Sequence, residues 1–220
     1  MRVDRCFAFV DLCGFTAFAD QHGDERVVLI LAEMRTTLRE SCARRGVRIV
    51  KWMGDGAMLS STMIDAVAGL VVELDQKMAR TVPSLPIRAG LDTGPVIMFE
   101  GDDYIGHPVN VAARLCAIAE PHELLATVDV AAARPRWIHA EPTRSVVVRG
   151  LSREVEGRAL TLADPGADPV VDPVCGLTIN RALGVTEGGE VYFCTDACLG
   201  SWLERQTTVA RRAMEHPGPA

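Results

Sequence analysis

The chain is organised around the stretch FAFVDLCGFT, residues 7–16. Its first half is a short apolar run, which predicts a buried central strand that carries Asp11 at its end. Gly14 permits a tight turn after this strand, and Thr16 is the expected N-cap of the helix that follows. Asp11 is therefore a candidate functional acid, although aspartate is also a common turn residue.

A second carboxylate, Asp55, lies in the run KWMGDG at residues 51–56. Its Asp-Gly pair separates two strand-like runs, residues 47–52 and 57–61, and is a strong hairpin signal. Two acids on neighbouring strand ends can bridge a pair of divalent cations such as Mg²⁺, which prefers oxygen ligands and shares them with phosphates. Taken alone, Asp55 is more often an ordinary turn residue, because Asp-Gly turns are common. Taken alone, Lys51 is more often a solvated lysine on an edge strand.

A third run, DYIGHPVNVAAR at residues 103–114, adds an acid, an amide and a guanidinium. We expect a helix over residues 109–118, on which Asn110 and Arg114 lie four residues apart and therefore on the same face. Taken singly, Asp103 is also consistent with a loop acid and Arg114 with a surface cation.

The rest of the first 162 residues alternates between helix and strand patterns. Two long helices are expected, over residues 24–45 and from a capping box at Thr62 and Asp65 to Met78. A second hairpin is expected from strands at residues 87–91 and 96–99 that turn near Thr93-Gly94-Pro95. Further strands are expected at residues 124–128 and 145–148, with a short helix near Ala131.

In this order and at these spacings, the three runs resemble the catalytic domain of the class III adenylate and guanylate cyclases. The resemblance covers roughly residues 5–160. It implies a fold of both helices and strands, α/β in the broad sense and α+β in the strict one. The expected core is ferredoxin-like, with a mixed or antiparallel sheet flanked by helices. It also implies that Asp11 and Asp55 bind two Mg²⁺ or Mn²⁺ ions.

The same resemblance implies that Lys51 and Asp103 recognise the purine base. Lysine can only donate hydrogen bonds and ionised aspartate can only accept them, which suits the N1 acceptor and N6 donor of adenine. Guanine presents the opposite pattern, so ATP is the expected substrate. Asn110 and Arg114 match the residues that orient the ribose and stabilise the transition state.

The implied reaction converts ATP to 3′,5′-cyclic AMP and pyrophosphate. In the family the metal ligands come from one subunit and the base-reading residues from its partner, which implies a homodimer with two sites at its interface. Two alternatives stay open at this stage. One is a guanylate cyclase, and the other is a non-catalytic scaffold that senses a nucleotide or a metal.

The composition is that of a globular protein, with 48% apolar and 24% charged residues. A net charge of −6 argues against a general nucleic-acid or anionic-membrane surface. No targeting segment or apolar run of membrane-spanning length is visible, so a cytoplasmic protein with reduced cysteines is expected.

Three of the seven cysteines cluster near the C-terminus, at Cys175, Cys194 and Cys198. The runs DPVCG at 172–176 and YFCTDAC at 192–198 resemble the YHS domain, which is related to the TRASH-type metal-binding modules. Three soft thiolates suit Zn²⁺ or Cu⁺, so these cysteines are candidate ligands of one of these ions. Three thiols in a small core are the alternative. We hypothesise that this module tunes the enzyme in response to metal or thiol redox state.

The expected domain organisation has four parts. They are a cyclase domain at residues 1–163, a Pro/Gly linker at 164–170, the YHS-like module at 171–205 and a helical or disordered tail at 206–220.

Overall fold

The computed structural model of the chain describes residues 1–81, 85–99, 103–148 and 154–215, with the side chains of 209–215 left undescribed. The chain divides into two compact units, Met1–Leu162 and Ala163–Ala220.

The first unit is built on one sheet, which has nine strands in the described part of the chain. Its main path runs in the order β2-β3-β1-β4-β6-β9-β7, with β5 on β4 and β8 on β9. The described pairings are antiparallel except that between β4 and β6. The strands are β1 Arg2–Leu12, β2 Arg48–Met53, β3 Gly56–Ser61, β4 Ile87–Phe99, β5 Asp103–Ile105, β6 Leu124–Thr127, β7 Ile138–Ala140, β8 Arg144–Val146 and β9 Val155–Leu162.

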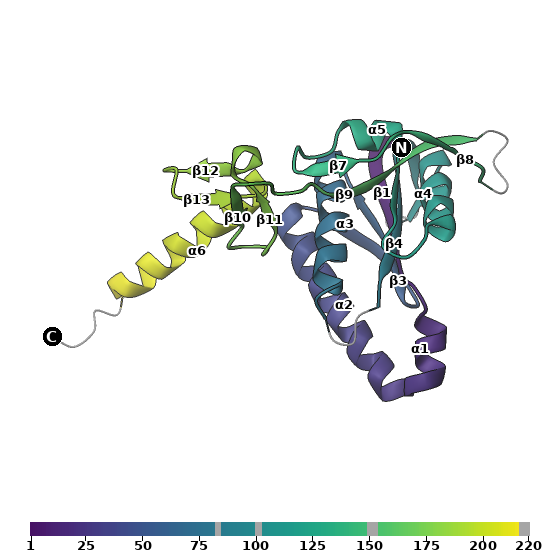
Figure 1. Cartoon of the computed structure of the whole chain (residues 1–220), viewed down its shortest axis with the longest axis horizontal. Helices are drawn as coiled ribbons and strands as arrows, with labels where there is room; N and C mark the ends of the chain where they lie inside the picture. The colour runs from purple at the N-terminus through teal and green to yellow at the C-terminus, as the bar shows by residue number, and fades with distance from the viewer. Residues whose placement is uncertain (82–84, 100–102, 149–153, 216–220) are drawn as a thin grey trace. The chain divides into compact units, whose positions relative to one another are not determined.

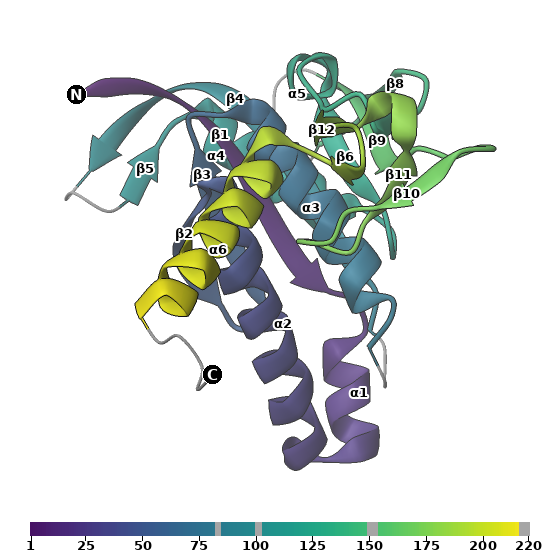
Figure 2. The same cartoon turned by 90° about the vertical axis from the view of Figure 1, so that its left-hand side faces the viewer.

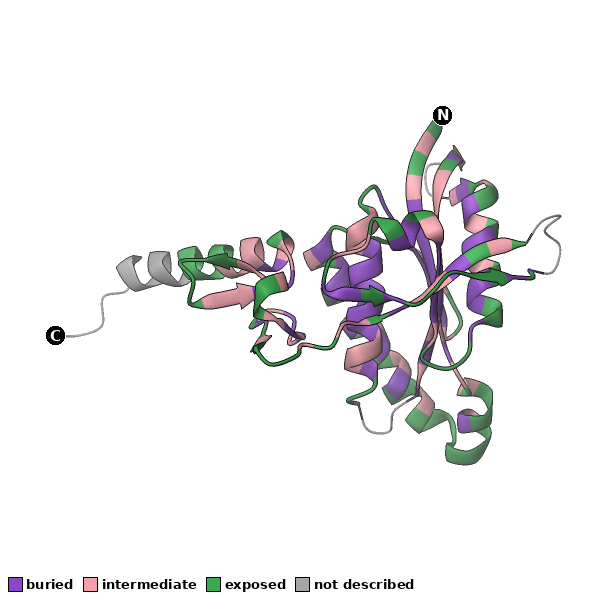
Figure 3. Cartoon of the chain, turned by 45° about the horizontal axis from the view of Figure 1, so that its top comes forward, coloured by how far each residue is buried: buried purple, intermediate pink, exposed green. Residues whose placement is uncertain are grey.

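Helices cover both faces of this sheet, α2 and α3 on one and α4 on the other (Figure 1, Figure 2). The helices are α1 Phe15–His22, α2 Asp24–Arg45, α3 Ile64–Met78, α4 His107–Ile118 and α5 Val128–Ala132. Buried residues gather where these helices meet the strands (Figure 3). The expected class, a mixed and mostly antiparallel sheet flanked by helices, is confirmed.

Strand β1 sorts its side chains onto the two faces by the period of two. Phe7 and Phe9 pack in one apolar cluster with Tyr104 of β5 and with Ala112 and Cys116 of α4. Asp11 follows at the same period, so its side chain belongs to the face that α4 covers.

Strand β4 corrects the expected second hairpin. It runs unbroken from Ile87 to Phe99, and β1 pairs with it from Arg2↔Ile97 to Leu12↔Ile87. Because β1 supplies a partner along this length, the Gly94-Pro95 pair is absorbed within the strand rather than forming a turn. Gly94 adopts a φ of 152°, which glycine tolerates readily.

Two expected helix caps are also wrong. Gly14, not Thr16, precedes α1, in a left-handed conformation and without a side-chain cap. Met63 precedes α3, so Thr62 and Asp65 form no capping box. The hydroxyl of Ser61 accepts the N–H of Met63 instead, at 3.2 Å.

A buried carboxylate ties α2 to α3. Glu73 accepts hydrogen bonds from the hydroxyl of Ser41 at 2.7 Å and from the guanidinium of Arg45 at 2.7 Å, and it pairs with Arg44 and Lys77. Burial alone raises the pKa of Glu73, but the two arginines more than offset this effect and lower it to about 2. The buried charge is therefore compensated within the helix pair.

Helix α4 approaches β4 closely at Gly90. A Cβ atom added there would lie 2.1 Å from the carbonyl oxygen of Ala112 and 2.2 Å from the backbone nitrogen of Cys116. Only a residue without a side chain lets the helix backbone rest on the strand at this distance. Gly90 thereby sets the position of the helix that carries Asn110 and Arg114.

The second unit consists of two small hairpins, a 3-10 turn and one helix. Part of the expected linker is a strand, since β10 begins at Pro169 and pairs with β11. Its elements are β10 Pro169–Val171, β11 Thr178–Asn180, the 3-10 turn Arg181–Leu183, β12 Val185–Glu187, β13 Val191–Phe193 and α6 Asp196–Glu215. Among the described residues of both units, no helix has the length and apolar character needed to span a membrane.

Substituting Gly90 tests the close packing of α4. We expect Gly90→Ala to lower the free energy of unfolding by about 1–3 kcal/mol, because the added methyl group collides with helix backbone. Urea denaturation followed by tryptophan fluorescence measures this change. Gly157→Ala in β9 is the control, since its Cβ would have its nearest neighbour at 3.5 Å. Equal stability of the two variants would contradict the packing argument.

Candidate functional site

Asp11 lies directly opposite Arg88 in the ladder between β1 and β4. Its Oδ2 accepts hydrogen bonds from Nη2 of Arg88 at 2.7 Å and from Nε at 3.1 Å. The hydrogen bond with Asp11 raises the pKa of Arg88 further. The pair is about one-third exposed, so the carboxylate is held at the mouth of a cleft and not in the core.

Asp55 reaches the same place through the β2–β3 turn. Met53 pairs with Gly56, which leaves Gly54 and Asp55 as the two turn residues, with Gly54 at a φ of 64°. A Cβ on Gly56 would lie 3.1 Å from Oδ1 of Asp11, so the hairpin tip lies against that carboxylate. Burial, and next the charge of Asp11, raise the pKa of Asp55.

A cleft of about 180 Å³ opens beside Asp11 and Arg88. Ala113 and Ala117 of α4 line it with small side chains. Asn110 and Arg114 are exposed and lie on the same side of α4 as these alanines, given the spacings of three and four residues. The lining of the cleft thus holds the carboxylate of Asp11 and the guanidinium of Arg88, and Asn110 and Arg114 lie on the same side of α4 outside that lining.

Lys51 of β2 and Asp103 of β5 form a second pair. Nζ of Lys51 donates to both carboxylate oxygens of Asp103, at 3.0 and 2.9 Å. The hydrogen bond from Lys51 lowers the pKa of Asp103. Both side chains are about half exposed, at 46% and 47%, so the pair contributes little to stability and remains accessible to a ligand.

The structure thus groups the expected site residues in two sets. Asp11 and Asp55 are neighbours, and Lys51 and Asp103 are bonded to each other. Arg88 is a site residue that the sequence analysis missed. Arg88 is the one charged residue in the apolar run at 87–91, and this feature could have drawn attention to it. Its pairing with Asp11, however, depends on the register of β1 on β4, which the sequence pattern does not reveal.

The donor set at Asp11 suits a hard divalent cation. Two carboxylates offer oxygen ligands, and they are close enough that, after burial, the charge of Asp11 raises the pKa of Asp55. Two thiols, Cys13 and Cys116, lie near this site, but burial raises the pKa of both, that of Cys116 to about 12. They are therefore neutral groups rather than thiolate ligands.

The model of the adenylate and guanylate cyclase catalytic domain matches residues 3–160. The chain belongs to this cyclase family. A Streptomyces coelicolor adenylate cyclase is 33% identical over 131 residues, which cover 59% of this chain and 34% of that protein. A pH-sensitive adenylate cyclase of Mycobacterium tuberculosis is 30% identical over 157 residues, covering 65% and 38%. The chain spans only about a third of the length of the first curated relatives it matches.

Solved cyclase structures share the fold. The adenylyl cyclase CyaB from P. aeruginosa aligns with a TM-score of 0.67 at 24% identity, covering 74% of this chain and 96% of that one. The guanylyl cyclase Cya2 aligns with a TM-score of 0.65 at 19% identity, covering 76% and 96%. Because both substrate classes occur on this fold, the likeness does not choose between ATP and GTP.

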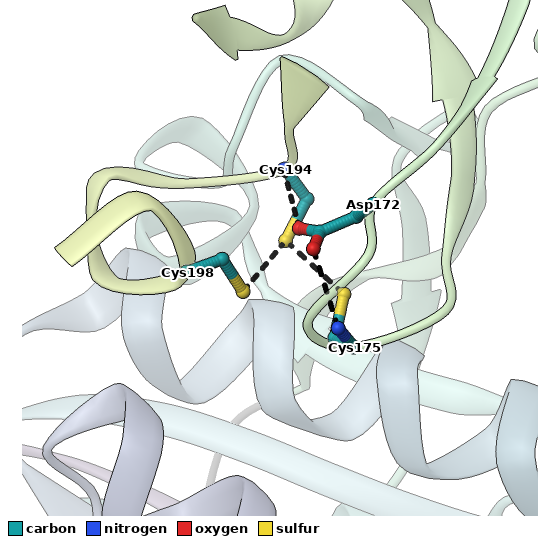
Figure 4. A group of neighbouring side chains, drawn as sticks. All are labelled: Asp172, Cys175, Cys194 and Cys198. Atoms are coloured by element: carbon teal, nitrogen blue, oxygen red, sulfur yellow. Dashed lines mark hydrogen bonds between the residues drawn. The ribbon is translucent and has the colours of Figure 1, made fainter. Parts of the chain in front are cut away.

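The three C-terminal cysteines lie together in the second unit, with Asp172 among them (Figure 4). Asp172 is a site residue that was not expected from the sequence. Its signal was the acid three positions before Cys175. The resemblance of this unit to the YHS domain stays a prediction, since the matched family model ends at residue 160.

The ion pair of Arg88 with Asp11 yields a test of the cation site. We expect Arg88→Gln to lower the free energy of unfolding without metal by about 1 kcal/mol or less, because the pair is partly exposed. We expect Mn²⁺ to raise the melting temperature of Arg88→Gln more than that of wild type, since no guanidinium then competes for the carboxylate. Thermal unfolding with and without Mn²⁺ measures both effects.

Arg26→Gln, at an exposed position of α2, is the matched control and should behave as wild type. A Mn²⁺ effect of the same size in wild type, Arg88→Gln and Asp11→Asn would show that the cation binds elsewhere.

Proposed function

We propose that the chain is an adenylate cyclase that converts ATP to 3′,5′-cyclic AMP and pyrophosphate for intracellular signalling. The observation that carries the proposal is the approach of Asp11 and Asp55, from two different strand ends, beside the guanidinium of Arg88. The names of the bacterial relatives support the choice of ATP.

In the proposed reaction the ribose 3′-oxygen attacks the α-phosphorus and loses its proton to solvent water. The bond from the α-phosphorus to the bridging oxygen breaks, and pyrophosphate leaves with the electron pair. Asp11 and Asp55 would hold two Mg²⁺ or Mn²⁺ ions, whose charge would lower the cost of removing the proton and of releasing pyrophosphate. No side chain would then have to act as a dedicated base.

Arginine side chains balance the charge of the triphosphate. Arg88 is bonded to Asp11 in the nucleotide-free chain, and it becomes available to phosphate oxygens when cations neutralise that carboxylate. Arg114 stabilises the negative charge that builds in the transition state, and Asn110 orients the ribose. Both project from the exposed side of α4.

Lys51 and Asp103 select the base. In the nucleotide-free chain they satisfy each other, and adenine inserts by giving Lys51 its N1 acceptor and Asp103 its N6 donor. Guanine would leave both side chains mispaired, at a cost of about 1–3 kcal/mol each.

The proposed active unit is a homodimer. Asp11 and Asp55 of one protomer work with Lys51, Asp103, Asn110 and Arg114 of its partner, so that two-fold symmetry builds two equivalent sites. Where β5 pairs with the end of β4, three apolar side chains are exposed and available for such an interface, those of Ile97, Phe99 and Ile105.

The purified full chain with Mn²⁺ and ATP tests the proposal by production of cyclic AMP. We expect activity in wild type and a loss of at least about a hundredfold in Asp11→Ala, because the cation ligand is removed. Asp4→Ala, an exposed acid on the same strand, should retain wild-type activity. ATP binding without any cyclic product would favour a nucleotide-sensing scaffold instead.

Substitution of Lys51 tests base selection separately. We expect Lys51→Met to leave stability unchanged and to reduce the preference for ATP over GTP roughly 5- to 150-fold in kcat/KM, the equivalent of about 1–3 kcal/mol. Initial rates with both nucleotides measure the ratio. Faster cyclisation of GTP than of ATP by wild type would identify a guanylate cyclase.

A further inference from the structure

Three thiols of the second unit converge from three separate elements. Cys175 lies in the turn between β10 and β11, Cys194 follows β13, and Cys198 lies in the first turn of α6. The sulfur of Cys194 is 3.6 Å from that of Cys175 and 3.6 Å from that of Cys198. Figure 4 shows the three sulfur atoms pointing toward one another.

These separations suit one shared cation. Sulfur atoms bound to the same ion at about 2.3 Å lie about 3.7–4.0 Å apart in tetrahedral or trigonal geometry. The three sulfurs and a carboxylate oxygen of Asp172 all lie within 4.8 Å of one another, so little movement is needed to close the site.

We propose that Cys175, Cys194 and Cys198 bind one thiophilic cation, and that Asp172 positions these ligands without joining them. The proposal concerns the second unit alone and stands whether or not the first unit cyclises ATP. Soft thiolate ligands select Cu⁺ or Zn²⁺ over the hard cations expected at Asp11.

The role of Asp172 follows from its hydrogen bonds. Its Oδ1 accepts the backbone N–H groups of Val174 at 2.8 Å and Cys175 at 3.2 Å, and its Oδ2 accepts that of Cys194 at 2.7 Å. Both oxygens are thus engaged with the backbone of two ligand residues. A carboxylate used in this way fixes the spacing of the ligands, as outer-shell groups do around metals.

A plain apolar core does not account for this arrangement. Asp172 is fully buried, and a hydrophobic core has no use for a buried carboxylate, which is costly to desolvate. The thiols meet through their sulfur atoms at the point where both hairpins and the helix start or end. The unit is also small, and few of its residues are buried beyond Leu177, Ile179 and Phe193, so a metal staple adds stability that the core cannot supply.

The test uses the full chain, reduced and freed of metal by chelator, then titrated with Cu⁺ or Zn²⁺ in separate arms. We expect one tightly held equivalent of at least one of the two ions in the second unit. X-ray absorption at the metal edge is expected to show three sulfur neighbours. Cys198→Ser should lose this equivalent, and Cys42→Ser, a buried thiol of α2, should keep it.

The variant Asp172→Asn shows whether Asp172 positions the cysteine ligands or binds the metal itself. We expect its metal affinity to fall about 10- to 100-fold while the set of neighbours around the metal stays the same. With Cu⁺, a wild-type spectrum that shows three sulfur neighbours and no oxygen decides the point even if this variant does not fold. With Zn²⁺, a water completes the shell, and its signal persists in Asp172→Asn.

Three outcomes would overturn the proposal. Failure of both ions to bind, or binding that survives Cys198→Ser, removes the metal site. An oxygen neighbour present in wild type and lost in Asp172→Asn makes Asp172 a ligand and refutes its positioning role.

Discussion

The antiparallel ladder between β1 and β4 is the constraint on which the site depends. It places Asp11 opposite Arg88, and the resulting ion pair holds the carboxylate at the edge of the cleft with its charge balanced. Beside this pair, the β2–β3 turn can approach β1 because Gly56 has no side chain, since a Cβ there would lie 2.6 Å from the carbonyl oxygen of Val10 and 3.1 Å from Oδ1 of Asp11. The position of the second acid, Asp55, follows from that contact.

The helix side of the cleft depends on a similar steric condition. At Gly90 the backbone of α4 rests on β4, which brings Ala113 and Ala117 against the cleft and carries Asn110 and Arg114 with them. The two faces of the sheet differ in what they carry. One buries the ion cluster of Glu73 that ties α2 to α3, and the other presents the charged groups of the site. Stability and chemistry are thereby assigned to opposite sides of one sheet.

Local patterns predicted much of this arrangement. The period of the apolar residues predicted α2 with its observed bounds, and the Asp-Gly signal predicted the β2–β3 hairpin. The pattern failed where a distant partner decides the conformation. Gly94-Pro95 indicated a turn, but pairing with β1 keeps β4 extended, and the same register made Arg88 a site residue. Asp172 was missed because its link to a second ligand residue, Cys194, joins residues 22 positions apart and is made only by the tertiary fold of the second unit.

The central claim is that Asp11 and Asp55 form a cation site from which Arg88 is released. A crystal structure of the full chain with Mn²⁺ and an ATP analogue that lacks the 3′-hydroxyl tests it most directly. We expect anomalous scattering from Mn²⁺ between the two carboxylates, with Arg88 turned toward phosphate oxygens. Manganese located elsewhere, with Arg88 still bonded to Asp11, would contradict it.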